Sequence, residues 1–277
     1  MRIDSHQHFW KYNPGRDGWI TNEMSALQRD FLPEDLFPVL RANGIDRSIA
    51  VQADQSEAET GFLLELAEHC AEIAGVVGWV NLLDENVSER LQHFSRYPKL
   101  RGFRHIVHAE QDDRFLLRKD FLRGVQALGE AGFTYDILIY PRHLPCANEF
   151  VRHFPRQKFV VDHLAKPGIK SHEIQSWQRD ISAIAENPNV FCKVSGMVVE
   201  ADWKGWKPED FTPYLDVVFE AFGIDRVMFG SDWPVCLLAA SYTQVTNIVE
   251  DYARDFSASD NEKLFGLNAA RFYGLPA

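Results

Sequence analysis

Short apolar runs alternate with longer amphipathic stretches from one end of the chain to the other. The short runs have the length and character of buried strands, and the stretches between them have the spacing of helices that bury one face. We predict strands at residues 2–8, 48–52, 74–80, 100–105, 134–139, 159–163, 190–194 and 226–229. We predict helices at residues 33–43, 57–72, 86–97, 120–131, 143–154, 173–186, 208–222 and 241–255, and a last helix at 257–273.

This alternation predicts the α/β fold class and one particular architecture. Eight strand–helix units within 277 residues indicate a closed (β/α)8 TIM barrel rather than an open, doubly wound sheet. Gly44, Gly132 and Gly223 stand where three of the helices must end before the chain returns to the sheet. No linker or repeat divides the chain, so we predict a single domain over residues 1–277, with a C-terminal extra helix after the eighth unit.

Charge and cysteine usage exclude several kinds of partner. The 29 Lys and Arg residues are outnumbered by 40 Asp and Glu residues, which gives a net charge of −11. This balance opposes binding to nucleic acid or to anionic membranes, which requires basic surfaces. The four cysteines are scattered without a C-x-x-C pair, and no apolar run is long enough to span a membrane. We therefore expect a soluble, cytoplasmic protein, and the sequence does not predict its oligomeric state.

Ionisable residues gather at the ends of the predicted strands. Asp4, His6 and His8 alternate along the first strand, so they share one face. In a barrel, all the strands end at the same face, where active sites are built. Unpaired buried charge is costly, so such a set points to chemistry rather than to stability. The other strand ends contribute Arg104, His163, Lys193 and Asp232.

Two connections after strands are unusually long, at residues 9–32 and 196–207. Both are predicted at the same face as the strand ends. They carry aromatic residues that individually suit the packing of a lid and together could stack on the apolar side of a ring. These aromatic residues are Trp10, Tyr12, Trp19, Trp203 and Trp206.

Six segments together carry a family resemblance. They span almost the whole chain and lie at residues 2–10, 30–36, 99–105, 162–167, 192–196 and 228–236. With these segments the chain resembles the amidohydrolase superfamily, which is marked by His-x-His on strand one, a histidine on strand six and an aspartate after strand eight. It is most similar to the sugar-lactonase branch, whose members open lactones such as L-fuconolactone and L-rhamnonolactone.

The resemblance has consequences for metal binding. Binuclear members of the superfamily use a lysine or glutamate on strand four and a histidine on strand five. Here strand four presents Arg104, and strand five ends without a histidine, since His143 lies beyond Pro141. We therefore expect no two-metal site. One divalent ion such as zinc could still bind to His6, His8, His163 and Asp232. In this branch, the resemblance implies that hydrolysis need not depend on a metal cofactor.

The predicted reaction is hydrolysis of a sugar lactone to the sugar acid. It requires a base for water, positive charge at the developing oxyanion and a proton for the departing ring oxygen. We assign Asp232 as the base, with His163 sharing the proton. His6, His8 and His163, or a zinc ion that they hold, would polarise the carbonyl. Arg104 and Lys193 would stabilise the oxyanion or bind substrate hydroxyls, and weaker candidates for sugar contact or for protonation of the leaving alkoxide are Tyr140, Asp136 and Lys166.

The loop at residues 108–113 is acidic, and we therefore expect a neutral polyhydroxy lactone rather than a dicarboxylate. Three alternatives remain open. One is a mononuclear, zinc-dependent hydrolase or decarboxylase of the same superfamily that acts on another small carboxylate or lactone. A phosphate-sugar isomerase is disfavoured because Ser195-Gly196 and Gly230-Ser231 are too sparse for a phosphate grip. The third is a barrel that binds sugar without converting it.

Overall fold

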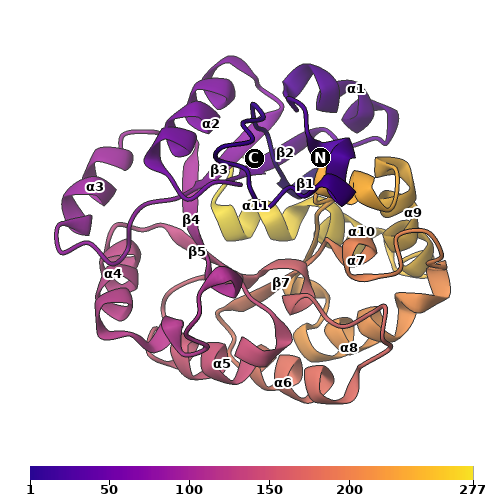
Figure 1. The fold of residues 1–277 in the computed structure, drawn as a ribbon. Helices are drawn as coiled ribbons and strands as arrows, with labels where there is room; N and C mark the ends of the chain where they lie inside the picture. Colours follow the sequence, from indigo (N-terminus) through magenta and orange to yellow (C-terminus); the bar gives the residue numbers. More distant parts are fainter. Residues whose placement is uncertain (277) are drawn as a thin grey trace.

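The structure is a computed structural model and describes residues 1–276. Eight parallel strands form one sheet in which each strand pairs with the next along the chain (Figure 1). The predicted TIM barrel is confirmed. The strands are β1 (Ile3–Gln7), β2 (Arg47–Val51), β3 (Ile73–Gly78), β4 (Leu100–Ile106), β5 (Thr134–Leu138), β6 (Phe159–Val161), β7 (Val190–Val194) and β8 (Val227–Phe229).

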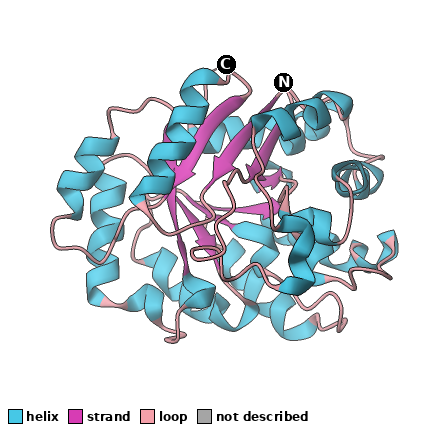
Figure 2. Cartoon of the chain, turned by 45° about the horizontal axis from the view of Figure 1, so that its top comes forward, coloured by secondary structure: helices cyan, strands magenta, loops and turns pink. Residues whose placement is uncertain are grey.

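Helices surround the strands (Figure 2). The α-helices of the first half of the chain are α1 (Pro33–Ala42), α2 (Glu57–His69), α3 (Val87–Phe94), α4 (Lys119–Glu130) and α5 (Leu144–Arg152). Those of the second half are α6 (Gln175–Ala185), α7 (Met197–Glu200), α8 (Thr212–Phe222), α9 (Tyr242–Tyr252), α10 (Ala258–Glu262) and α11 (Asn268–Tyr273). None of the helices among residues 1–276 combines the length and the apolar character that a bilayer crossing requires.

The first and last strands meet just beyond their carboxyl ends. Gln7 and Trp233 form an isolated parallel bridge. The His8 amide donates a hydrogen bond to the Trp233 carbonyl over 2.7 Å, and the Asp232 amide donates one to the His6 carbonyl over 2.8 Å. The backbone contacts that complete the ring therefore lie among the predicted site residues.

Local sequence explains where several elements end. Gly44, Gly132 and Gly223 have positive φ angles of 64°, 83° and 65°, a backbone region that glycine enters at low cost. The predicted last helix over 257–273 is interrupted, because α10 passes into a π-helical turn at Lys263–Leu267 before α11 begins. Gly266 lies in this turn, where the Met1 carbonyl would collide with any Cβ atom.

The C-terminal helix α11 lies across the N-terminal end of the barrel, in yellow behind the ring of strands in Figure 1. Its apolar side packs against residues from the starts of strands, and the Phe272 and Phe191 rings are 5.0 Å apart. The fully buried Tyr273 hydroxyl donates a hydrogen bond to Asp136 Oδ2 over 2.7 Å. This extra helix therefore contacts the polar interior of the barrel from its N-terminal end.

Candidate active site

Strand β1 delivers two imidazoles to the carboxyl end of the barrel, as its alternation predicts. The Nε2 atoms of His6 and His8 lie 3.3 Å apart. His8 Nδ1 lies 2.7 Å from the Val51 carbonyl oxygen. Because that oxygen only accepts, Nδ1 carries the proton and the lone pair of His8 Nε2 faces the pocket.

Asp232 enters the site from a turn just after β8. Its backbone adopts the left-handed conformation with φ of 58°. The preceding Ser231 is anchored to β1, because its amide and its hydroxyl both donate to the Asp4 carboxylate, over 2.9 Å and 2.6 Å. Asp4 therefore fixes this turn, and its carboxylate is fully buried.

His163 is presented by a left-handed turn rather than by the end of strand six. β6 stops at Val161, and the four residues His163 to Lys166 have φ angles of 54°, 54°, 59° and 54°. Such angles cost about 1–2 kcal/mol per residue outside glycine, so the surroundings must hold the turn. The Trp177 indole donates to the Leu164 carbonyl over 2.7 Å. His163 Nδ1 lies 2.8 Å from Ser195 Oγ.

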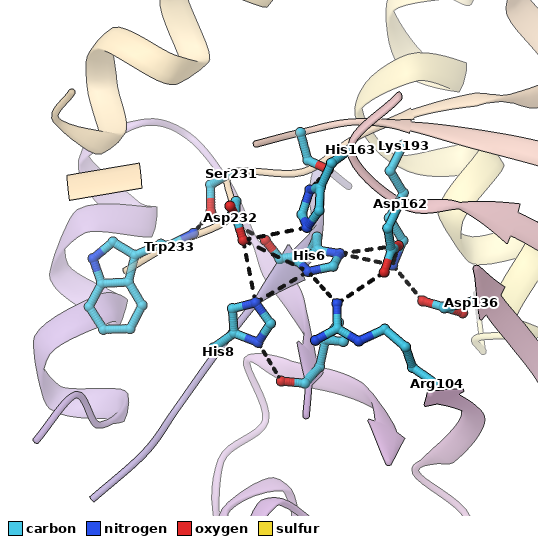
Figure 3. Close-up of polar contacts among 12 residues, drawn as sticks. His6, His8, Arg104, Asp136, Asp162, His163, Lys193, Ser231, Asp232 and Trp233 are labelled. Carbon is cyan, nitrogen blue, oxygen red and sulfur yellow. Dashed lines mark hydrogen bonds and ion pairs between the residues drawn. The ribbon is translucent and has the colours of Figure 1, made fainter. Parts of the chain in front are cut away.

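Three imidazoles converge on one carboxylate oxygen (Figure 3). Asp232 Oδ1 lies 3.3 Å from His8 Nε2, 3.8 Å from His163 Nε2 and 3.9 Å from His6 Nε2. We call His6, His8, His163 and Asp232 the pocket layer. All four were predicted from the sequence, and the structure brings them together.

The pocket layer has the donor set of a zinc site. Zinc–nitrogen distances of about 2.0–2.1 Å in a tetrahedron place ligand atoms about 3.3–3.5 Å apart. The donor atoms of His6, His8 and Asp232 all lie within 4.8 Å of one another. The outer nitrogens of His8 and His163 are held by Val51 and Ser195, as is usual for metal-binding histidines. The residues therefore fit one divalent ion, although Arg104 Nη1 also approaches His6 Nε2 to 3.2 Å.

Burial and charge set the protonation states of the pocket layer. Burial lowers the pKa of His163 to about 4, and it lowers the pKa of His6 well below its usual value. Burial alone would raise the pKa of Asp232, but the adjacent His163 and the contact with His8 hold that pKa below its ordinary value. The neutral imidazoles of His6 and His163 therefore lie beside an ionised carboxylate.

A second group of charges, which we call the buried layer, comprises Asp136, Asp162 and Lys193. Lys193 Nζ lies 2.6 Å from Asp136 Oδ2, 3.0 Å from Asp162 Oδ1 and 3.2 Å from His6 Nδ1. All three residues are fully buried. Lys193 and Asp136 were expected to contact substrate, but their place beneath His6 favours a role in supporting that histidine.

Opposite effects act on the two carboxylates of the buried layer. Burial raises the pKa of Asp136 to about 6, although Lys193 opposes the rise. Burial would also raise the pKa of Asp162, but Lys193, His6 and Arg104 together hold that pKa well below its ordinary value. Arg104 Nη1 donates to Asp162 Oδ2 over 3.0 Å, and its other terminal nitrogen donates to the Gln52 carbonyl. Arg104 therefore links His6 to the buried layer.

Lys166 and Tyr140 lie on another side of the pocket. Lys166 Nζ lies 2.7 Å from Glu200 Oε1, and both side chains are partly buried. Burial disfavours the charge on Lys166, but Glu200 and Asp232 raise its pKa above the ordinary value. Tyr140 follows β5 and packs against His108 with 4.9 Å between ring centroids.

Two tryptophans of the long loops are held by hydrogen bonds to the backbone. Trp10 and Trp206 are tied down because their indole nitrogens donate to the carbonyls of Arg29 and Ala239. Trp19 packs edge-on against Trp10 and remains 42% exposed. Trp10 and Trp206 are therefore packed within their loops, as expected for single tryptophans of a lid.

The acidic loop after β4 is less informative about substrate than its sequence suggests. Glu110 Oε1 lies 2.7 Å from His105 Nε2, and Asp113 Oδ1 lies 2.9 Å from Arg142 Nε. These carboxylates therefore pair with cationic or neutral groups of the surrounding elements, and they fasten the loop.

Sequence reasoning assigned no role to Asp162, Ser195 or Glu200. Asp162 carried a signal, because it directly precedes His163 at the end of a strand. Ser195 and Glu200 carried none, since their partners come from the left-handed turn at His163 to Lys166. The sequence does not indicate that turn, because none of the residues 163–166 is a glycine.

The comparisons with known proteins agree with this geometry. Residues 3–275 match the family model described as amidohydrolase. The chain belongs to the amidohydrolase family. This finding confirms the resemblance that the six sequence segments indicated.

Two relatives and one solved structure place the chain within the family. It is 44% identical over 287 residues to an L-fucono-1,5-lactonase of Burkholderia multivorans, covering 100% of this chain and 97% of that protein. It is 37% identical to an L-fucono-1,5-lactonase of Burkholderia ambifaria, covering 99% and 96%. A crystal structure of a Burkholderia multivorans amidohydrolase with bound zinc has a TM-score of 0.96 and 44% identity, with 100% of both chains covered.

Proposed function

We propose that this amidohydrolase is a sugar lactonase that opens a 1,5-lactone of the L-fuconolactone type to the corresponding sugar acid. The observation that carries the proposal is the convergence of three imidazoles on Asp232 Oδ1. The likeness over the whole chain to two L-fucono-1,5-lactonases supports the choice of substrate class.

In this proposal Asp232 acts as the base. Its carboxylate is ionised, so Oδ1 can take a proton from a water molecule whose oxygen attacks the lactone carbonyl carbon. The ring C–O bond then breaks as the tetrahedral intermediate collapses, and the leaving alkoxide regains a proton. The proton that Asp232 takes from the water is then available for this alkoxide.

The neighbouring residues stabilise charge during the reaction. Arg104 Nη1 lies beside His6 Nε2 at the floor of the pocket and would bind the developing oxyanion or a substrate hydroxyl. Lys166 and Tyr140 would contact the sugar or donate toward the leaving oxygen. Lys193 and Asp136 would act indirectly, by holding His6.

His6, His8, His163 and Asp232 would hold a zinc ion. When bound, zinc would act as a Lewis acid on the carbonyl oxygen. The chain's own contribution is to keep the imidazoles of His6 and His163 neutral and to occupy the outer nitrogens of His8 and His163, so that their Nε2 atoms face Asp232.

Charge pairing favours an uncharged substrate. A carboxylate-bearing lactone needs a cation free to pair with it. Among the site residues, Arg104 pairs with Asp162, Lys166 with Glu200, and Lys193 with Asp136. A neutral polyhydroxy lactone therefore suits this pocket better than a dicarboxylate.

Acid release from a panel of sugar lactones tests the proposal. Purified protein is mixed with L-fucono-1,5-lactone and with other aldonolactones in weak buffer that contains a pH indicator, with and without a chelator. We expect hydrolysis of at least one aldonolactone above the spontaneous rate. Absence of hydrolysis both in the chelated protein and in protein reloaded with zinc would reject lactonase activity.

A further inference from the structure

His108 is a polar residue at the carboxyl end of the barrel that the proposed mechanism does not use. It lies in a single 3-10 turn, Val107–Ala109, directly after β4. Its Nδ1 atom is buried and has no hydrogen-bond partner among the described residues. A buried polar atom without a partner costs free energy, so it requires an explanation such as a ligand.

The surroundings of His108 come from three neighbouring strands. Its ring packs at 4.9 Å from the Tyr140 ring, which follows β5. The charges of Lys166 and Arg104 act on it, and so does His163, which lies in the turn after β6. His108 therefore lies at the carboxyl end of the barrel, on the side formed by β4, β5 and β6.

The same surroundings keep the imidazole uncharged. Burial is the main cause, with Lys166 and Arg104 next, and together they lower the pKa of His108 to about 3. A neutral imidazole has one N–H donor and one lone pair. A hydroxyl group can pair with Nδ1 in either tautomer, because it accepts from an N–H and donates to a lone pair, whereas the cations nearby can only donate.

We infer that His108 binds a hydroxyl group of the lactone ring and so contributes to specificity for polyhydroxylated lactones. Tyr140 and Lys166 form the rest of this subsite. The Tyr140 ring is itself held in place, because the Arg142 guanidinium lies 5.1 Å from its centroid. The inference rests on the proposed lactonase function and adds to it a residue that selects the substrate.

A comparison of two six-membered lactones as substrates distinguishes recognition of the hydroxyl groups from the ring-opening reaction itself. L-Fucono-1,5-lactone carries ring hydroxyls, and δ-valerolactone is the same kind of cyclic ester without them. The measured quantity is the ratio of kcat/KM for the first lactone to kcat/KM for the second. In His108→Leu, which removes both ring nitrogens, we expect this ratio to fall about tenfold, the contribution of a hydrogen bond to an uncharged group.

Two further variants control for indirect effects. His108→Asn keeps a polar atom near the position of Nδ1, and it should recover part of the ratio. His153→Leu makes the same change at an exposed histidine beyond α5 and should leave the ratio unchanged. Thermal unfolding of each variant verifies that it is folded.

The outcomes are distinct. A ratio unchanged in His108→Leu, or an equal fall for both lactones, would overturn the assignment of His108 to hydroxyl recognition. A wild-type protein that shows no preference for the hydroxylated lactone would also overturn it. Failure of the proposed function itself is a different result, in which the wild-type protein hydrolyses neither lactone.

Discussion

The pocket layer and the buried layer both consist of ionisable side chains inside one barrel, yet they differ in how their charges are satisfied. In the buried layer, Lys193 Nζ lies within 3.0 Å of an oxygen of each carboxylate, so both buried negative charges have a cation beside them. In the pocket layer, imidazole nitrogens and a carboxylate oxygen face one another at 3.3–3.9 Å, and the Arg104 guanidinium approaches this group at His6 Nε2, over 3.2 Å. The pairing in the buried layer favours a structural role, whereas the donor atoms that face one another in the pocket layer favour binding of a ligand.

The strongest effect on stability is expected from Lys193→Met. The change leaves Asp136 and Asp162 buried without their shared cation, so the free energy of unfolding should fall by about 3–5 kcal/mol. Urea unfolding measures the loss. Lys204→Met removes an exposed lysine from the loop after β7 and should have almost no effect. A loss below about 1 kcal/mol in Lys193→Met would mean that the buried layer does not depend on its cation.

Glu59 tests what burial does to a carboxyl group without a close cation. Burial raises its pKa from 4.5 to about 7, although its Oε1 accepts hydrogen bonds from two backbone amides. Because the folded-state pKa is the higher one, the folded protein binds the proton more tightly. The associated stabilisation is present below pH 4.5 and is lost as the pH rises through about 7.

Glu59→Gln should remove that pH dependence. Between pH 5 and pH 8 we expect the wild-type protein to lose about 1–3 kcal/mol more stability than the variant does. Urea unfolding at the two pH values measures the difference. Glu65→Gln, at an exposed position of the same helix α2, should behave like the wild type. Parallel pH profiles for Glu59→Gln and the wild type would contradict the burial argument.

Gly196→Ala tests whether the position of His163 matters to the pocket layer. A Cβ atom there would lie 2.7 Å from His163 Nδ1, and the φ angle of 66° adds strain of about 1–2 kcal/mol. We expect kcat/KM to fall at least tenfold. Gly274→Ala is the matched control, because Gly274 is also left-handed, with a φ angle of 61°, but has no atom within 4 Å of the place that a Cβ atom would take. Equal activity in the two variants would show that strain, and not His163, determines the outcome.

The smallest effect is expected from Tyr273→Phe. The change removes the hydrogen bond from α11 to Asp136, which should lower the free energy of unfolding by about 1 kcal/mol. Tyr252→Phe removes a hydroxyl that contacts Asp216 near the surface and should cost less. If the two variants lose equal stability, α11 contributes no specific support to the buried layer.

Periodicity was enough to predict the barrel and most of the pocket layer. The alternation of β1 placed His6 and His8 on one face, and parallel strands must end together, so Asp232 could be expected opposite them. Gly44, Gly132 and Gly223 correctly indicated where three helices end, because each has a positive φ angle that favours glycine.

The roles of the other residues depend on distances between side chains, which the periodicity of the sequence cannot predict. Lys193 lies near the end of β7 like a substrate ligand, but its ammonium group is held by Asp136 and Asp162 beneath His6. The left-handed turn that positions His163 contains no glycine, so none of its four residues indicates a turn by its type. Its stability comes from tertiary contacts such as the one with Trp177.

The most direct measurement compares one carboxylate from each layer, in the variants Asp232→Asn and Asp136→Asn. For each variant, kcat for L-fucono-1,5-lactone and the melting temperature are measured. Asp232→Asn should lose kcat by about 10²–10⁴-fold and melt close to the wild type, because it removes the base from a site that is not needed for folding. Asp136→Asn should melt at a clearly lower temperature and lose less than about tenfold in kcat. Near-normal turnover in Asp232→Asn, or a greater loss of turnover in Asp136→Asn, would contradict the division of roles between the two layers.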